Sequence, residues 1–168
     1  MKKMKRLVAV LLAGIMALAV LTACGGTPSA PVTRDEALEK SVAEWTVELG
    51  KGANLELTQD ATLTSISDKC LSAMVKIYDA KDEDAAKAAE KELKKAFVAA
   101  TKGKKVAPVA VYIPGTEVTK DALAQAVQND MSNIQTDLER FGVNKPTKFG
   151  VTATKQKDYT LIFFMVSE

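Results

Sequence analysis

Residues 159–166 read Tyr-Thr-Leu-Ile-Phe-Phe-Met-Val, and this stretch decides the fold. Every residue from Leu161 to Val166 is apolar. Successive side chains of an extended strand point to opposite faces of a sheet, so both faces are hydrophobic here. A strand of this kind is buried on both sides. The stretch therefore predicts a central strand with helices packed above and below it.

Two other segments have the alternating pattern of a strand. Apolar residues alternate over 149–153, which a polar turn at 155–158 separates from the central strand. They alternate again over 109–113, between Pro108 and Pro114. Proline cannot donate a hydrogen bond to a neighbouring strand, so Pro108 places that end at an edge or a bulge.

Helical periodicity predicts four helices around these strands. The third has a thin apolar stripe, which indicates a surface helix anchored by Leu93 and Phe97. We predict an α/β chain of the α+β type, with a small, mostly antiparallel sheet of three or more strands sandwiched between about four helices. The first predicted helix begins at a capping box of Thr33 and Glu36 and ends at Gly50. The second covers about Gln59 to Asp79 and the third covers 82–100. The fourth begins after Thr119 and ends at Gly142.

The first 23 residues have the three parts of an export signal. Four cationic residues precede an apolar run from Leu7 to Leu21, and small residues follow. The run has about 15 residues, fewer than the roughly 20 that span a bilayer. We therefore predict a removable signal peptide. An uncleaved anchor or a plain secretory leader is the alternative.

The end of this leader resembles the lipobox of bacterial lipoproteins, Leu21-Thr22-Ala23-Cys24. The resemblance implies cleavage between Ala23 and Cys24 and a diacylglyceryl group on Cys24. Two acyl chains hold a protein durably at a membrane. We expect a signal peptide at 1–23, a lipidated cysteine and flexible tether at 24–32, and one domain at 33–168 on the extracytoplasmic face of the cell membrane.

Lipidation of Cys24 leaves Cys70 as the second of two cysteines, without a partner for a disulfide. Cys70 lies on an apolar helical stripe. We predict that it is buried in the core; a reactive thiol is the alternative.

The order of segments resembles the CAP superfamily (cysteine-rich secretory protein, antigen 5, pathogenesis-related 1). The resemblance covers residues 37–168. It rests on the connector Gly52-Ala53-Asn54-Leu55-Glu56-Leu57 between the first two helices and on the closing strands Phe149-Gly150-Val151-Thr152-Ala153 and Tyr159-Thr160-Leu161-Ile162-Phe163-Phe164. It implies a CAP-like fold.

The resemblance implies no catalytic site, because the residues that form the family's cleft are missing. Members often hold a metal with two histidines and two acidic residues, and this chain has no histidine. The glycine-glutamate-asparagine motif is absent where Tyr112-Ile113-Pro114-Gly115 stands, and the charged helix at 82–100 occupies the region of the first cleft histidine. No functional residue is carried over from the family.

Composition excludes several other classes of function. Without histidine the chain lacks the usual general base and zinc ligand. Without the four leader cations, the 23 Lys and Arg fall to 19 against 21 acidic residues, so net charge does not indicate nucleic-acid binding. No serine-lysine pair, hydrolase elbow, complete phosphate loop or calcium loop occurs. We expect no enzyme, metal or cofactor.

One candidate binding feature remains, a group of lysines opposed only by Glu92. Such a group can bind an envelope polyanion or an anionic surface. The alternative is a solvated helix end whose lysines complement the helix dipole. The lysines are Lys91, Lys94, Lys95, Lys102, Lys104 and Lys105.

The sequence leaves three functions open. The first is a non-catalytic, lipid-anchored binding domain with an envelope polyanion or protein partner. The second is an envelope glycan hydrolase with two carboxylates, which requires a converging pair with one raised pKa. The third is a small inhibitor or accessory subunit that acts through an exposed apolar patch.

Overall fold

β4 (Tyr159–Ser167) is the central strand of the sheet. In the computed structural model, which describes residues 32–168, it pairs antiparallel with β3 (Lys148–Lys155) on one side and with β2 (Ala107–Pro114) on the other. Its side chains are buried from Tyr159 to Met165. The prediction of a central strand, made from its two apolar faces, is confirmed.

The sheet has four strands in the order β1-β3-β4-β2. β2 lies at an edge, as Pro108 predicts. β1 (Thr58–Gln59) pairs parallel with β3, with Thr58 opposite Lys148. A strand of two residues has no detectable period, so the apolar pattern did not predict it. The mostly antiparallel sheet of an α+β fold is confirmed.

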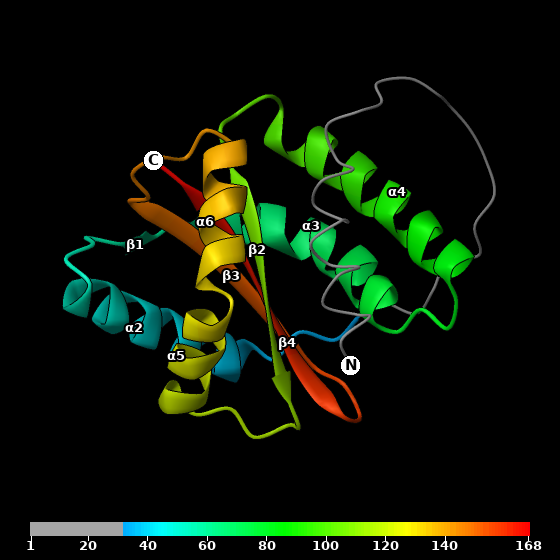
Figure 1. Cartoon of the computed structure of the whole chain (residues 1–168), viewed down its shortest axis with the longest axis horizontal. Helices are drawn as coiled ribbons and strands as arrows, with labels where there is room; N and C mark the ends of the chain where they lie inside the picture. Colours follow the sequence, from blue (N-terminus) through cyan, green and yellow to red (C-terminus); the bar gives the residue numbers. More distant parts are fainter. Residues whose placement is uncertain (1–31) are drawn as a thin grey trace. The chain divides into compact units, whose positions relative to one another are not determined.

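Residues 32–168 contain five helices, which cover both faces of the sheet (Figure 1). α3 packs on β3 and β4, and α4 packs on α3; α2, α5 and α6 contact β3 or β2 from the opposite side. The bounds are α2 (Glu36–Gly52), α3 (Ala61–Tyr78), α4 (Glu83–Thr101), α5 (Lys120–Asn129) and α6 (Met131–Arg140).

The face of the sheet toward α2 and α5 is held by apolar side chains. Phe149 of β3 and Phe164 of β4 lie there with ring centroids 6.4 Å apart. One buried carboxylate joins this layer, because Glu39 of α2 accepts hydrogen bonds from the backbone N–H of Ala153 and from Nε of Arg34, both at 2.9 Å. The cluster contains Leu38, Val42, Ala43, Val109, Val111, Ile113, Leu123, Phe149, Val151, Ala153, Ile162 and Phe164.

The opposite face also buries apolar side chains, among them Leu161, Phe163 and Met165 of β4, and it adds a close approach and buried hydrogen bonds. A Cβ added at Gly150 would lie 2.0 Å from the backbone N of Thr64, so the start of α3 rests directly on β3. The buried hydroxyl of Ser67 donates to the carbonyl of Phe163 at 2.7 Å and lies 2.7 Å from the hydroxyl of Thr152. α3 therefore sits closer to the sheet than a layer of side chains would allow.

Both predicted ends of the first helix are wrong. Asp35, not Thr33, is the N-cap, with its side chain accepting from the N–H of Leu38. Gly50 lies inside the helix, where a Cβ would come within 3.0 Å of Leu57. The chain leaves α2 through Asn54, whose φ of 59° is left-handed. Asparagine tolerates this conformation, so it replaces the predicted glycine stop.

The single helix predicted from Thr119 to Phe141 is divided. α5 ends and α6 begins at Asp130, whose carbonyl accepts the N–H of Asn133 and Ile134. The side chain of Asp130 makes no cap hydrogen bond and instead accepts from the side-chain amide of Asn133. Met131, directly after the break, is 43% exposed.

Residues 1–31 are outside the described part of the chain. The predicted signal peptide, the cleavage site at Ala23 and Cys24, the lipidation at Cys24 and nearly all of the tether fall there and remain predictions. Residues 32–168 form one compact unit. Within it, no helix is both long and apolar enough to traverse a bilayer.

Candidate functional site

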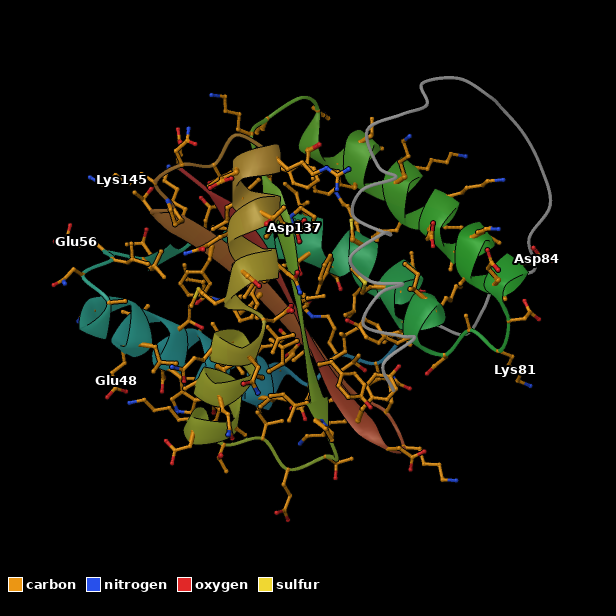
Figure 2. The ribbon with its side chains drawn as sticks, viewed as in Figure 1. Glu48, Glu56, Lys81, Asp84, Asp137 and Lys145 are labelled. Carbon is orange, nitrogen blue, oxygen red and sulfur yellow. The ribbon has the colours of Figure 1, made fainter. Side chains whose placement is uncertain are left out.

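The lysines of the predicted basic group separate into two places. Lys91 and Lys95 are exposed and lie one turn apart on α4, with the half-buried Lys94 beside them, and the exposed Lys102 follows as the C-cap of the helix. In Figure 2, blue-tipped side chains project outward from α4. We call Lys91, Lys94, Lys95 and Lys102 the α4 lysine face.

The other two lysines leave this face because the backbone turns. Lys102 and Gly103 both have positive φ, 48° and 78°, and they end α4 in the left-handed conformation. The chain then turns into β2, carrying Lys104 and Lys105 to the end of the sheet where β2 starts and β4 finishes. The sequence therefore predicted one basic group where the structure has two.

The lysines of both places lack acidic partners within residues 32–168. Glu92, the expected opposing charge, instead binds Lys76 of α3 at 2.6 Å, and the nearby ion pair on α4 joins Lys87 to Glu83 at 2.7 Å. Glu90 is half-buried, and this burial raises its pKa. No lysine of the α4 lysine face therefore forms an ion pair within the described residues.

Lys104 and Lys105 line a cavity of about 260 Å³ at the start of α3, where Lys148 of β3 joins them. Lys148 is 43 residues beyond Lys105, and no local pattern marks it as a binding residue. It reaches the cavity through the pairing of β3 in the sheet. The cavity is lined by Asp60, Thr62, Leu63, Ile66, Lys104, Lys105, Val106, Lys148, Ser167 and Glu168. We call it the α3 cavity.

Two carboxylates also line the α3 cavity, and each already accepts a backbone N–H. Asp60 caps α3 by accepting from Leu63 at 3.0 Å, and this bond, with a smaller effect of the charge on Lys148, lowers its pKa. Glu168 accepts from Asn144 at 2.9 Å, which likewise lowers its pKa. Neither pairs with one of the three lysines.

A second titratable site lies on α6, where Figure 2 labels Asp137 beside β2. Asp137 is only 8% exposed, and burial raises its pKa to about 6. The charge of Asp130 raises the pKa further, while Arg140 opposes the shift. The sequence missed Asp137 because a polar residue between apolar stripe positions looks solvent-exposed in a helical pattern.

The three tyrosines of the chain meet where α3 ends. Tyr112 of β2 stacks on Tyr78 and on Tyr159, with ring centroids 5.6 and 5.1 Å apart. The hydroxyl of Tyr159 hydrogen-bonds to the carboxylate of Asp79 at 2.8 Å. Because the rings pack against one another, this cluster stabilises the join between α3 and the sheet.

Cys70 is fully buried, and this burial raises the pKa of its thiol to about 12. The prediction that it is a core residue is confirmed. Within residues 32–168, no cluster of three or more histidine, cysteine, aspartate or glutamate side chains is arranged to hold a metal. The large exposed apolar side chains of this region, Val98, Tyr112 and Met131, belong to three different elements.

The comparisons with known proteins assign no family. Searches with protein-family models, among curated proteins and among solved structures found no match to the chain.

Proposed function

We propose that this chain is a lipid-anchored, non-catalytic binding domain on the extracytoplasmic face of a bacterial cell membrane, and that its α4 lysine face binds a phosphodiester polyanion of the envelope. The observation that carries the proposal is the row of lysines along α4 without acidic partners in the described fold.

The helix dipole accounts for Lys102 at the C-cap of α4 but not for the other three lysines. The dipole favours cations only in the last turn of a helix. α4 ends at Thr101 and has no basic residue in its last turn, so Lys91, Lys94 and Lys95 lie outside the reach of that effect. An external anion would offset the repulsion among these lysines, and each residue near an anionic surface would contribute about 1 kcal/mol.

The anchor rests on the leader and on Cys24. A small residue before the predicted cleavage site and a thiol after it fit the lipobox. Each buried methylene of an acyl chain contributes about 0.8 kcal/mol, so two chains hold the domain at the membrane. Eight tether residues, 25–32, would reach roughly 15 Å on average. The domain would then stand close to the polyanions at the cell surface.

Mass spectrometry of the protein purified from membranes tests the anchor. We expect a mature N-terminus at Cys24 that carries a diacylglyceryl group with palmitate-type chains. Cys24→Ser should abolish the modification and release the protein from the membrane fraction. A mature N-terminus elsewhere, or an unmodified thiol at residue 24, contradicts the anchor.

Binding of the full-length lipidated chain in phosphatidylcholine nanodiscs to immobilised poly(glycerol phosphate) tests the α4 lysine face. Neutralising four cations should weaken binding by about tenfold or more at low salt, because four favourable charge interactions are lost. The variant is K91Q/K94Q/K95Q/K102Q, and the matched control is K40Q/K51Q/K69Q/K157Q.

The two variants have the same change in net charge, so only position distinguishes them. Equal binding by both contradicts the proposal. Binding to phosphatidylglycerol vesicles but not to the polymer would assign the lysines to the membrane surface instead, which also overturns it.

The CAP-like assignment is part of the proposal. It is supported by the order of elements, in which a helix, a short connector and a second helix come first, and a closing pair of antiparallel strands comes last. The lack of histidine supports a domain without the family's metal cleft.

A carboxylate glycan hydrolase is the second candidate. It is favoured by Asp137, whose raised pKa suits a general acid, and by the proximity of Asp130. The test is release of reducing ends from purified envelope glycan. Activity in the parent that D137N removes, in a variant that is still folded, would replace the non-catalytic proposal. No activity in the parent rejects the hydrolase.

A further inference from the structure

We infer that the α3 cavity binds a single phosphate group of the same polyanion, as a specific site beside the less specific α4 lysine face. The inference rests on the proposed function for the source of the ligand. Its own basis is the meeting of Lys104, Lys105 and Lys148 around a cavity of about 260 Å³.

The fold holds these lysines in place from two separate segments. Lys148 lies in β3, opposite Ser167 of β4 and next to Thr58 of β1, so its backbone is paired on both sides. Lys105 passes over the turn after α6, where a Cβ added at Gly142 would lie 3.7 Å from its Cδ and Cε. A backbone that the fold already orders need not be ordered when an anion binds.

The lining carries more lysines than acidic side chains. Three ammonium groups line the cavity with the side-chain carboxylates of Asp60 and Glu168, which accept backbone N–H groups from Leu63 and Asn144. These backbone hydrogen bonds lower the pKa of each carboxylate most, and the charges of Lys148 and Lys105 lower it further. No lysine of the cavity lies within ion-pair distance of a carboxylate of residues 32–168, so each ammonium group could donate to a phosphate.

The rest of the lining favours a phosphate ester over a bare ion. The hydroxyls of Thr62 and Ser167 can hydrogen-bond to ester or alcohol oxygens, and Leu63, Ile66 and Val106 supply an apolar side. The volume is at the small end for ligand sites, which limits the occupant to one phosphate and a short carbon unit. Glycerol phosphate has this chemistry, as an end group of a polymer, as part of a lipid headgroup or free in solution.

Ligand-observed ³¹P NMR on the full-length chain in phosphatidylcholine nanodiscs tests the cavity. Glycerol phosphate and inorganic phosphate are the probes. We expect saturable line broadening for glycerol phosphate and weaker binding of inorganic phosphate. K148Q should weaken binding of glycerol phosphate by about tenfold or more, because it removes a charged hydrogen bond. K105Q should act similarly.

The control is K157Q, which makes the same change in the turn at the other end of β3 and should bind as the parent does. Thermal unfolding establishes that K148Q is folded. Broadening that does not saturate, or equal binding by K148Q, K105Q and K157Q, overturns the inference.

The two proposals fail in distinguishable ways. Neutralising the α4 lysine face should reduce retention on the polymer and leave the affinity for glycerol phosphate unchanged. Loss of saturable glycerol phosphate binding in that variant would overturn the cavity as a separate site. Unchanged polymer retention with K148Q-sensitive glycerol phosphate binding would reject the proposed function and leave the cavity standing.

The source of the ligand is settled by competition. Poly(glycerol phosphate) should displace glycerol phosphate from the parent, and phosphatidylglycerol nanodiscs should not. Displacement by the lipid alone would overturn the polymer as the source.

Discussion

Phe149 and Gly150 are neighbours in β3, yet they serve opposite faces of the sheet in opposite ways. Phe149 fills the layer between the sheet and α2 with one of the largest fully buried side chains in the described domain. Gly150 has no side chain, and α3 lies against its Cα. Both faces bury apolar side chains, but at these two positions the first face is filled by an aromatic ring and the second by the backbone of α3.

This difference teaches that two neighbouring positions of one strand tolerate different changes. A face filled with side chains loses stability when volume is removed, because a cavity remains. A face in backbone contact loses stability when volume is added, because the helix must move. The predictions that follow test this contrast, beginning with the largest expected effect.

Phe149→Ala should lower the free energy of unfolding by about 3–5 kcal/mol, since it empties a buried aromatic site. Urea denaturation measures the change. Val98→Ala, on the exposed side of α4, is the control and should change stability by less than about 0.5 kcal/mol. A loss below about 1 kcal/mol for Phe149→Ala would mean that this layer does not depend on volume.

Gly150→Ala should cost about 3 kcal/mol, because the new Cβ would meet the backbone of Leu63 and Thr64 at 2.1 and 2.0 Å. The same urea experiment applies. Gly52→Ala is the matched control, since nothing lies within 4 Å of its added Cβ and it sits in a helix. That variant should be neutral or slightly stabilised. Equal stability of the two alanine variants contradicts direct contact between α3 and β3.

Ser67→Ala should cost about 1–2 kcal/mol, because it leaves the buried hydroxyl of Thr152 and the carbonyl of Phe163 without this partner. Ser65→Ala, on the exposed side of the same helix, controls for helix propensity and should change little. If both variants unfold at the same urea concentration, hydrogen bonds do not hold this face.

Asp137→Asn should raise the free energy of unfolding at pH 7 by about 1 kcal/mol. The pKa of Asp137 is raised from 3.8 to about 6 in the folded chain. Between these values the folded state keeps a proton that the unfolded state has lost, so stability falls as pH rises through this window. The free energy of unfolding of the asparagine variant should not fall in this window, and below about pH 4 the variant should be no more stable than the parent.

Urea unfolding of the parent and the variant at several pH values between 4 and 7 measures this dependence. Glu139→Gln, an exposed residue of the same helix, should leave the pH dependence unchanged. If the free energy of unfolding of the parent chain is constant between pH 4 and 6, the pKa of Asp137 is not raised by burial.

The elements with long, strong periods were predictable. The central strand, both flanking strands, α3 and α4 follow from apolar spacing, and Leu93 and Phe97 are buried as that spacing requires. The start of α2 was not predictable to the residue, because both Thr33 and Asp35 can accept a capping hydrogen bond and the structure uses Asp35. The break at Asp130 has no side-chain cap hydrogen bond and interrupts a continuous apolar pattern. The strand β1 was missed since two residues have no period.

The candidate sites were predictable only in part. The lysines of α4 and the following loop are neighbours in sequence, and the pattern found all six. Lys148 joins two of them through the pairing of β3, and the low exposure of Asp137 depends on how α6 lies on the domain. Neither relation has a local signature.

The amino-acid sequence by itself determined the fold class and the strand at its centre, because hydrophobic periodicity depends on neighbouring residues alone. It also carries the whole case for the leader and for Cys24. Only the tertiary structure decided that the lysines form two separate surfaces and that a cavity lies at the start of α3. Those features arise where segments that are far apart in the sequence come together, and a local pattern of residues does not predict such contacts.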